Sequence, residues 1–453
     1  MKARLYILIL LCFGAISCSK QKFLDERPKS DLFVPATLEE FQALLDNDFA
    51  MGLTPVLGEL SADNFYLNSS LWQGIGTVEQ STYIWEPDIF NGNGNIADWN
   101  VPYKQVLYAN VVLFGLEDVA RTSENQHQWD HIKGSALFFR ACAFYNLAQV
   151  FALPYNAATA NTVPGIPLKM SPNIDESVKR SSIEQTYTQI LNDLLQAKTL
   201  LADSVTSIRI RPNKPAAFAM LARVYLSMRD YTKAGAYADS SLQLYSELID
   251  YNTRDAASSR PFTSSNVETM YQSRFVETNV LKGVLGFAAV DSTLYKTYAI
   301  NDLRRTLFFW IVPGRIAFRG SYTGLTHAFS GLATDETYLI RAECKARAGE
   351  VNSAMDDLNT LLIKRWDSGT FVPLTASTKD EAINIVLLER RKEMPCRGVR
   401  WTDIRRLNLD GANIKPKRMV NNKEYELQPN SLKYALYIPP DAVLMGGYKQ
   451  NER

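Results

Sequence analysis

Four aromatic side chains lie in two stretches of the chain that show little helical or strand periodicity. Tyr66 and Trp72 belong to residues 51–100, a turn-rich region with the run NGNGN, and Trp310 and Tyr322 belong to residues 246–335. Trp and Tyr present flat apolar rings on which sugar faces stack, and long irregular loops often carry function. We therefore predict that these four residues bind a ligand. The alternative is that they pack in the core, as aromatic side chains commonly do.

The sequence offers little catalytic chemistry. It contains no P-loop, no G-x-S-x-G and no H-E-x-x-H motif. Glu389 and Glu393 could in principle form the carboxylate pair of a glycosidase. Arg390, Arg391 and Lys392 are interleaved with them, however, which indicates ion pairs rather than an acid with a raised pKa beside a nucleophile. We predict a binding protein without catalytic residues, and a glycosidase is the minor alternative.

Metal and thiol chemistry are also weakly supported. His127 and His131 are four residues apart and could share one helix face, but no third ligand accompanies them and no C-x-x-C motif occurs. Cys142, Cys344 and Cys396 are widely spaced and odd in number, so no disulfide framework is visible. The sequence therefore predicts no metal and no cofactor, with these three cysteines buried as small apolar side chains.

The stretch LERRKEMPCRGVRWTDIRRL, residues 388–407, contains six arginines. These could contact an anionic ligand, but acids of matching number occur nearby. Bidentate arginine–carboxylate pairs also suit the contacts between helices. We favour a structural network in which Arg390, Arg391 and Arg400 pair with Glu336, Glu343, Glu389 or Asp403.

The N-terminus has the pattern of an export signal. Lys2 and Arg4 precede an apolar segment from Leu5 to about Ile16, which is shorter than the roughly 20 residues needed to span a bilayer. The sequence Ala15-Ile16-Ser17-Cys18 resembles a lipobox. We predict a signal peptide over residues 1–17, lipidation of Cys18, and a tether over residues 18–30. The alternative is ordinary signal-peptidase cleavage with Cys18 as a bystander.

Composition narrows the class of protein. Lys plus Arg number 49 and Asp plus Glu number 48, and no basic block is interleaved with aromatic residues, so we expect no nucleic-acid partner. Hydrophobic residues make up 46% of the 453 residues, enough for a sizeable core. No later segment has 18 consecutive apolar residues, so we expect no transmembrane helix in the mature chain.

Helical periodicity dominates outside the two irregular stretches. Thr37 and Ser182 are candidate N-caps, and helices are expected at about 100–153 as a pair, at 378–393 and near 401–407, before a loop-like tail. Residues 216–245 form a predicted helix-turn-helix that recurs 120 residues later: Ala222 aligns with Ala342, and Ala234 with Ala354. Small residues at such positions let helices approach closely, as in tetratricopeptide repeats. We predict a mainly α fold of tetratricopeptide-like helical hairpins forming a superhelical scaffold, with long irregular loops. The alternative is that these are ordinary αα-hairpins, which show the same alanines.

Several of these segments together resemble one protein family over nearly the whole mature chain. They are Cys18 followed by FLDERP, the Trp85 and Trp99 to Asn110 region, GSALFFRACAFYNLAQVF with the later PGIPL, Asp302-Leu303-Arg304, TDETYLIRAECKARAGE, the arginine-rich stretch, and YIPPDAVLMGGYKQN. The chain is similar to the RagB/SusD family of outer-membrane nutrient-binding lipoproteins.

The resemblance implies a lipid-anchored protein of the outer membrane, facing the cell exterior, with SusD-like regions at residues 31–260 and 261–453. It implies a partner, a TonB-dependent SusC-like transporter over which the protein acts as a lid. It also implies a nutrient ligand, most often an oligo- or polysaccharide and in some members a peptide, which would use the same loops through backbone hydrogen bonds.

Overall fold

Helices make up most of the computed structural model, which describes residues 35–282 and 286–453. The described helices belong to one compact unit, Thr37–Arg453. The predicted signal peptide, Cys18 and the whole of the predicted tether lie outside the described residues. The longer helices are α8 (Ala97–Gly115), α9 (Gln126–Phe151), α10 (Ile183–Leu200), α11 (Lys214–Met228), α12 (Tyr231–Leu244), α15 (Thr334–Ala348), α16 (Val351–Leu362), α17 (Lys379–Glu393) and α18 (Arg400–Leu409).

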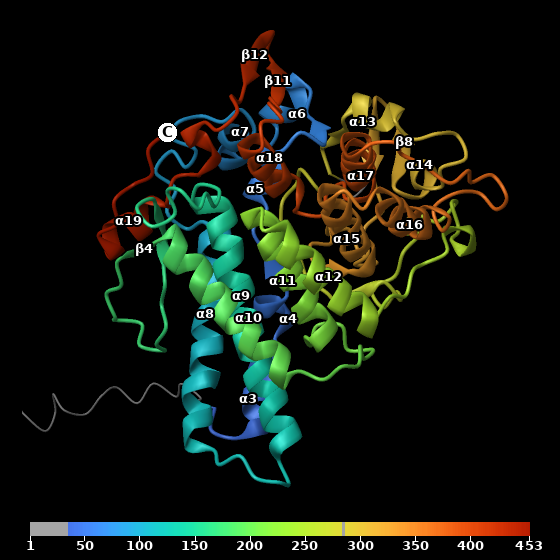
Figure 1. Ribbon diagram of the computed structural model, residues 1–453. Helices are drawn as coiled ribbons and strands as arrows, with labels where there is room; N and C mark the ends of the chain where they lie inside the picture. The colour runs from blue at the N-terminus through green and yellow to red at the C-terminus, as the bar shows by residue number, and fades with distance from the viewer. Residues whose placement is uncertain (1–34, 283–285) are drawn as a thin grey trace, which may run out of the picture. The chain divides into compact units, whose positions relative to one another are not determined.

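These helices pack largely against their neighbours in sequence. The contacts run from α8 to α9, α10, α11 and α12 in turn, then from α12 to α15, which also packs against α16 and α17 (Figure 1). The predicted mainly α fold with helical hairpins is therefore confirmed. Within the described residues, no helix is both long and apolar enough to cross a membrane.

The two predicted repeats are the hairpins α11–α12 and α15–α16. In both, the first helix ends on a residue in the left-handed conformation, Arg229 with φ 65° and Gly349 with φ 87°. The aligned alanines are fully buried. Where α12 crosses α15, a Cβ added to Gly235 would come within 2.9 Å of the Cys344 Cβ. Small residues thus allow the close helix contacts that the sequence predicted.

Local helix-start signals are confirmed at both predicted caps. The Thr37 hydroxyl accepts from the Glu40 amide, and the Glu40 side chain accepts from the Thr37 amide, at the start of α3 (Leu38–Leu45). Ser182 and Gln185 form the same reciprocal pair at the start of α10. Each pair satisfies amides that a helix cannot bond internally.

Residues 51–100 form short elements held in place by side chains of α8. They are α4 (Asp48–Met51), β1 (Leu53–Thr54), α5 (Leu57–Ser61), β2 (Phe65–Tyr66), α6 (Ser69–Gln73) and α7 (Thr77–Tyr83). The buried Asp98 carboxylate accepts from the amides of Val56 and Leu57 at 2.6 and 2.7 Å. Gln105 donates to the Leu53 carbonyl at 2.7 Å. These bonds satisfy backbone that has few partners of its own.

The second irregular stretch pairs with the first through short strands. Parallel β1–β6 places Leu53 opposite Arg274, and antiparallel β2–β7 places Tyr66 opposite Ala289. The elements of this stretch are β5 (Thr269–Tyr271), β6 (Arg274–Phe275), β7 (Ala289–Val290), α13 (Ser292–Lys296), α14 (Arg304–Leu307), β8 (Phe309–Val312), β9 (Arg315–Phe318) and β10 (Leu332–Ala333). Two regions that are more than 200 residues apart therefore pair through backbone hydrogen bonds, in separate two-stranded sheets.

The C-terminal tail has regular structure where the sequence suggested a loop. It contains the hairpin β11–β12 (Lys417–Val420 and Lys423–Glu426) and α19 (Pro440–Gly446). The prediction of a loop-like tail was wrong because the hairpin is fixed by distant residues. The Arg418 guanidinium lies 4.3 Å from the Tyr83 ring centroid, and the Asn421 amide donates to the Ser69 hydroxyl at 2.8 Å. The remaining pair, β3–β4 (Pro164–Pro167 and Arg180–Ser182), lies between α9 and α10.

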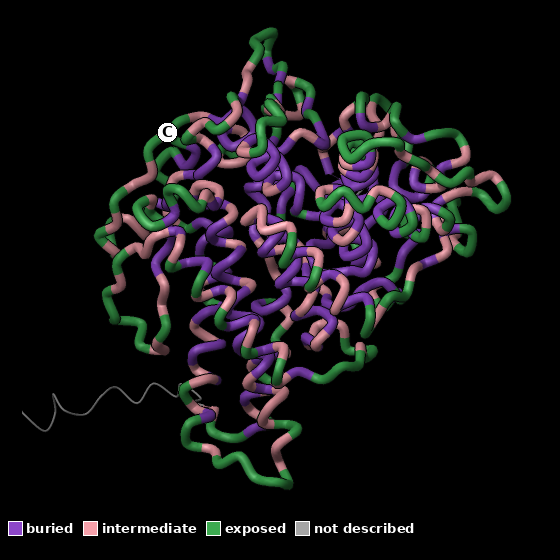
Figure 2. The backbone as a smooth tube through the Cα atoms, viewed as in Figure 1, coloured by how far each residue is buried: buried purple, intermediate pink, exposed green. Residues whose placement is uncertain are grey.

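One large hydrophobic core draws residues from Leu38 to Ile438, and a smaller cluster joins α15, α16 and α17. The buried residues run through the middle of the helical unit, and the exposed ones lie mostly at its edges (Figure 2). Because residues on both sides of position 260 contribute to the large core, the division into regions 31–260 and 261–453 remains a prediction. Cys344 and Cys396 are buried and Cys142 is half-buried, and all three thiols are free.

The arginine-rich stretch forms a buried ion-pair network, as favoured, although two partners differ. Arg390 pairs with Asp403 at 2.8 Å and with Glu336 at 3.3 Å, as predicted. Arg400 and Arg391 instead reach Asp63, at 2.6 and 3.5 Å. The prediction of their partners was wrong because it considered acids close in sequence or in the repeat, whereas the chain brings Asp63 in from the first irregular stretch.

Candidate functional site

Tyr66 and Trp310 are exposed on adjoining pairs of short strands. Tyr66 is 43% exposed on β2 while its neighbour Phe65 is buried, and Trp310 is 36% exposed on β8 while Phe309 is buried. Alternate residues of a strand point to opposite faces, so one aromatic ring of each pair fills the core and the other faces outward. Strand β7 pairs with β2 and packs against β9, the partner of β8. The structure therefore places Tyr66 and Trp310 on one connected group of strands.

Trp310 is held against a fixed cation. The Arg319 guanidinium lies 4.2 Å from the Trp310 ring centroid and donates to the carbonyls of Ala256 and Thr306 at 2.7 and 2.6 Å. The β8–β9 hairpin turns at Gly314, whose φ of 79° favours glycine. A cation over the ring and a short hairpin restrict the Trp310 side chain, which lowers the entropy lost when a ligand packs on it.

Trp72 lies on α6, which begins three residues after Tyr66. It is half-buried, packs against the large core, and donates its indole N–H to the Gln80 carbonyl at 3.1 Å. The tip of the β11–β12 hairpin contacts the same helix (Figure 1). Met419 on this hairpin is exposed. The sequence analysis missed this hairpin, and the run Asn421-Asn422, both with positive φ, is the turn signal that could have revealed it.

Tyr322 does not belong to this surface. It is fully buried, and its hydroxyl lies 2.7 Å from the Tyr251 hydroxyl and 2.6 Å from the Glu268 carboxylate, to which it donates. Burial raises the pKa of Glu268 to about 7, against the opposing effect of Arg365. The prediction that Tyr322 contacts ligand is corrected: its ring and hydroxyl are already occupied by core partners, and no ring face is open for stacking.

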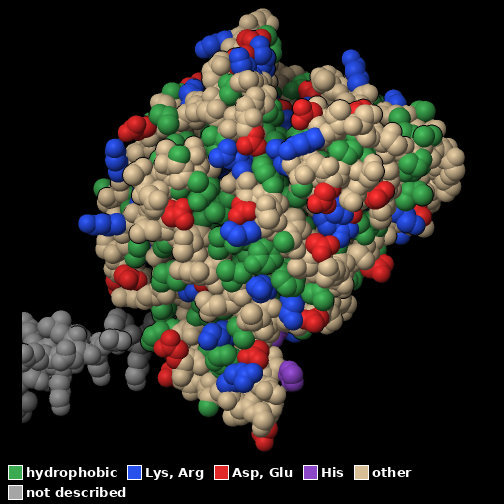
Figure 3. Space-filling model, viewed as in Figure 1, with side chains coloured by type: hydrophobic (Ala, Val, Ile, Leu, Met, Phe, Trp, Pro, Cys, Tyr) green, Lys and Arg blue, Asp and Glu red, His purple; other side chains and the backbone are tan. Residues whose placement is uncertain are grey.

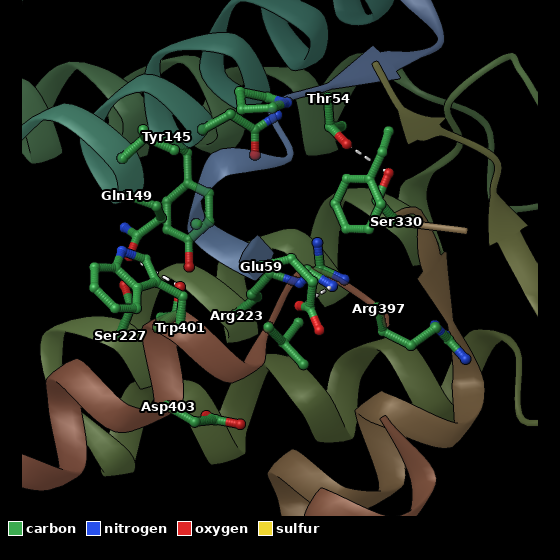
Figure 4. A pocket seen from close by; sticks show the side chains of 18 of the residues that line it. Thr54, Glu59, Tyr145, Gln149, Arg223, Ser227, Ser330, Arg397, Trp401 and Asp403 are labelled. Atoms are coloured by element: carbon green, nitrogen blue, oxygen red, sulfur yellow. Dashed lines mark hydrogen bonds between the residues drawn. The ribbon is translucent and has the colours of Figure 1, made fainter. Parts of the chain in front are cut away.

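A small internal cavity lies where α5, α9, α11 and α18 meet (Figure 4). Its volume is about 50 Å³, and its lining includes Glu59, Asp403 and Trp401. One Glu59 oxygen accepts from the Gly398 amide at 3.1 Å, while the other oxygen and the Trp401 indole N–H have no partner. Burial raises the pKa of Glu59 to about 7.

The pKa of Asp403, which also lines this cavity, is shifted in the opposite direction to that of Glu59. Burial opposes its charge, but the Arg390 and Arg406 guanidinia, each bonded at 2.8 Å, outweigh burial and lower the pKa of Asp403. One raised and one lowered carboxyl pKa is the pattern of a glycosidase pair. A cavity of about 50 Å³ holds only one or two waters at roughly 30 Å³ each. It therefore has no room for a sugar ring, and its unpartnered polar atoms fit bound water.

A larger groove of about 800 Å³ lies between the last turns of α8, the first half of α9 and the middle of α10. Phe114 is exposed on its wall, and the Lys133 ammonium lies 4.8 Å from the ring centroid of Trp129. Its floor contains the buried pair of Arg140 and Asp193, 2.7 Å apart. The groove falls within the usual size of small-molecule sites, about 300–1,000 Å³. It is a second candidate site, and the sequence analysis did not find it.

Charges on the visible face of the molecule are mixed rather than segregated (Figure 3). Lys and Arg side chains alternate with Asp and Glu, and apolar side chains lie between them. Binding of a polyanion such as nucleic acid relies on clustered positive charge. This face offers no such cluster, in keeping with the near-equal numbers of acidic and basic residues.

The chain is similar to known proteins both in sequence and in fold. Residues 22–226 match a family model described as "Starch-binding associating with outer membrane", and residues 334–441 match the model of the SusD family. The chain is 25% identical over 418 residues to the SusD-like protein P2 of Formosa agariphila, covering 78% of this chain and 79% of that protein.

Solved structures share the fold over nearly all of the chain. A SusD superfamily protein from Bacteroides thetaiotaomicron is 19% identical with a TM-score of 0.76, covering 92% of this chain and 100% of the other. The surface glycan-binding protein A from Bacteroides uniformis is 16% identical with a TM-score of 0.71, covering 92% and 99%. A SusD-like carbohydrate binding protein from Bacteroides vulgatus is 18% identical with a TM-score of 0.68, covering 91% and 97%.

Proposed function

The chain belongs to the SusD/RagB family, and on this premise we propose that it is an outer-membrane lipoprotein that binds an oligo- or polysaccharide and delivers it to a TonB-dependent SusC-like transporter. Lipidation of Cys18 would anchor it, with the folded unit facing the cell exterior. The function is binding rather than catalysis. The observation that carries the proposal is the exposure of Tyr66 and Trp310 on adjoining strand pairs in a family whose model is described as starch-binding.

The chemistry of these rings suits a glycan. A pyranose presents a face of C–H groups that packs on an aromatic ring, and its hydroxyls need polar neighbours at the edge. Trp310 offers a restrained ring beside the Arg319 guanidinium, and Tyr66 offers a ring with a hydroxyl. Trp72 supports this surface from α6, with its indole N–H already committed to Gln80. We propose Tyr66 and Trp310 as stacking residues and Trp72 as their packed support.

Titration calorimetry with a panel of neutral oligosaccharides tests this proposal. We expect the native chain to give saturable heat. Trp310→Ala should lose about tenfold or more in affinity, because stacking on one ring is worth ~1–3 kcal/mol in comparable contacts. Trp310→Phe keeps a ring and should recover part of the affinity. Trp129→Ala is the matched control, because it removes a half-buried tryptophan from the 800 Å³ groove instead. Loss of binding in Trp129→Ala alone would move the site to that groove.

The alternatives give different results in the same experiment. Heat with peptides and not with sugars supports a peptide-binding lipoprotein of the same transporter system. Shortened oligosaccharide after overnight incubation supports a glycosidase and overturns the binding-only function. Delivery is tested in cells: a deletion strain complemented with Trp310→Ala should take up the glycan more slowly than one complemented with the native chain.

A further inference from the structure

One arginine of the stretch 388–407 differs from the other five. Each of the others has a carboxylate partner: Arg390 with Asp403, Arg391 and Arg400 with Asp63, Arg397 with Asp335, and Arg406 with Glu343. Arg405 has no carboxylate partner among residues 35–282 and 286–453. The structural network that accounts for the rest of the stretch therefore leaves this cation unexplained.

Arg405 is also deeply buried, at 2% exposure. Its two terminal nitrogens donate to the carbonyls of Gln149 and Ala152 at the C-terminal end of α9. Helix carbonyls carry only partial negative charge, about half a unit for a whole helix end, so the guanidinium is not neutralised. Burial accordingly lowers the pKa of Arg405 to about 10, with only tyrosines opposing it. Its Nε–H has no hydrogen-bond partner.

This side chain lines a cavity of about 120 Å³ between the end of α9, the end of α18 and residues 430–434. Hydroxyl and amide groups surround it, and no acidic residue lines it; the lining comprises Leu153, Pro154, Asn156, Thr159, Val163, Arg405, Asn408, Leu409, Asn430, Ser431 and Tyr434. The Tyr434 hydroxyl accepts a hydrogen bond from the Asn408 side-chain amide at 3.2 Å. The hydroxyl proton of Tyr434 is therefore available to donate to a ligand. The Ser431 hydroxyl likewise accepts, from the Lys433 amide at 3.2 Å.

The acid nearest in sequence is already committed elsewhere. Asp410 follows the lining residue Leu409, but its oxygens bond Arg229, at 3.2 Å, and the Tyr231 hydroxyl, and one lies 3.5 Å from Arg347. On the other side, Lys433 and Arg453 add positive charge close to Tyr434, since the Arg453 guanidinium donates to the Lys433 carbonyl. Asp63 also acts on the Tyr434 hydroxyl, but its carboxylate is paired with Arg400 at 2.6 Å and with Arg391 at 3.5 Å. The cavity lining thus combines donors and one cation with no acidic residue, which disfavours a cation and favours an anion.

We propose that this cavity binds a small oxyanion, a carboxylate or a sulfate, through the hydroxyls of Tyr434 and Ser431, with the Arg405 guanidinium as its counter-charge. A buried charge without a partner is costly, and an anion at this position would supply the missing partner. A cavity of about 150 Å³ accommodates benzene, so 120 Å³ suits an anionic group of a few heavy atoms rather than a whole sugar. The anion is either free in solution or an acidic substituent on a glycan.

Calorimetric titration of the mature chain distinguishes these sources. The probes are sodium sulfate, sodium acetate and sodium glucuronate, with glucose as the neutral counterpart and sodium chloride holding ionic strength constant. We expect saturable binding of at least one oxyanion and none of glucose at this site. Acetate binding as tightly as glucuronate assigns the site to free anions; a clear preference for glucuronate assigns it to an acidic sugar.

Variants locate the site. Tyr434→Phe keeps the ring that packs 4.9 Å from Trp401 and removes only the hydroxyl. We expect it to weaken the anion about tenfold, as does loss of a hydrogen bond to a charged group. Ser431→Ala, at a half-buried loop position, should weaken it in the same direction. Tyr103→Phe is the matched control, because it removes a buried hydroxyl that donates to the Pro167 carbonyl, away from the cavity.

Two results of these titrations would overturn the proposal. No saturable oxyanion binding by the native chain, or binding unchanged in both Tyr434→Phe and Ser431→Ala, means that water fills the cavity and overturns the proposal. Because the cavity shares no residue with the Tyr66 and Trp310 surface, neutral glycan binding can fail while oxyanion binding persists, and the reverse.

Discussion

Replacing the buried Glu59 by glutamine should remove a pH dependence from the stability of the fold. Burial raises the pKa of Glu59 from 4.5 to about 7 in the folded chain. Between these values the folded chain holds a proton that the unfolded chain has released, so stability falls as pH rises through this window and stays low above pH 7. At ~1.4 kcal/mol per pKa unit, the loss is about 3 kcal/mol.

Glutamine cannot ionise but keeps the shape and the acceptor for the Gly398 amide. We therefore expect Glu59→Gln to match the native chain near pH 4.5 and to exceed its free energy of unfolding by about 3 kcal/mol at pH 8. The assay is urea unfolding followed by tryptophan fluorescence at pH 4.5, 6 and 8. Glu117→Gln, an exposed acid on the rim of the large groove, is the control and should change little.

Two results would refute this reasoning. If Glu59→Gln is less stable than the native chain at pH 8, the charged carboxylate is stabilised by Arg400 more than burial penalises it. If the difference between the two chains is the same at all three pH values, Glu59 does not titrate in this window. Ionisation of Asp98, whose pKa burial raises to about 6, acts in the same direction in both chains and cancels in the comparison.

Three further predictions address the network, a cap and the anchor. Arg304→Met should lower the free energy of unfolding by about 3–5 kcal/mol, because the buried carboxylates of Asp302, Glu389 and Glu393 lose the cation that they share. The shift of the midpoint of urea unfolding measures this loss. Thr37→Ala should cost about 1 kcal/mol through loss of the capping box, seen as a lower thermal midpoint with the fold intact. Cys18→Ser should move the protein from the membrane to the soluble fraction of cells, since the thiol is the predicted lipidation point.

Features set by residues close in sequence could be predicted from the sequence. The capping boxes at Thr37 and Ser182 involve residues three apart, and the repeat hairpins are defined by small residues one helix turn apart. The family resemblance rests on such local segments, and the fold follows from them. The helical hairpins can therefore be predicted from local residue spacing together with the family resemblance.

Features set by distant residues could not be predicted. Arg400 pairs with Asp63 across 337 positions, and the irregular stretches pair β1 with β6 across 221. Tyr322 illustrates the consequence for the site: its segment lacks periodicity, as a surface loop does, yet Tyr251 and Glu268 enclose it from 71 and 54 positions away. Lack of periodicity indicates that backbone is irregular, not that it is exposed.

The same pairing explains how irregular segments can present a defined binding surface. Short strands leave many backbone groups without a ladder partner, and such groups must be satisfied for the segment to stay folded. Asp98 and Gln105 on α8 do this for the first stretch, and Arg319 does it for the second by bonding the carbonyls of Ala256 and Thr306. Arg319 also lies against Trp310. The side chain that orders the loop is therefore also the one that restrains the Trp310 ring.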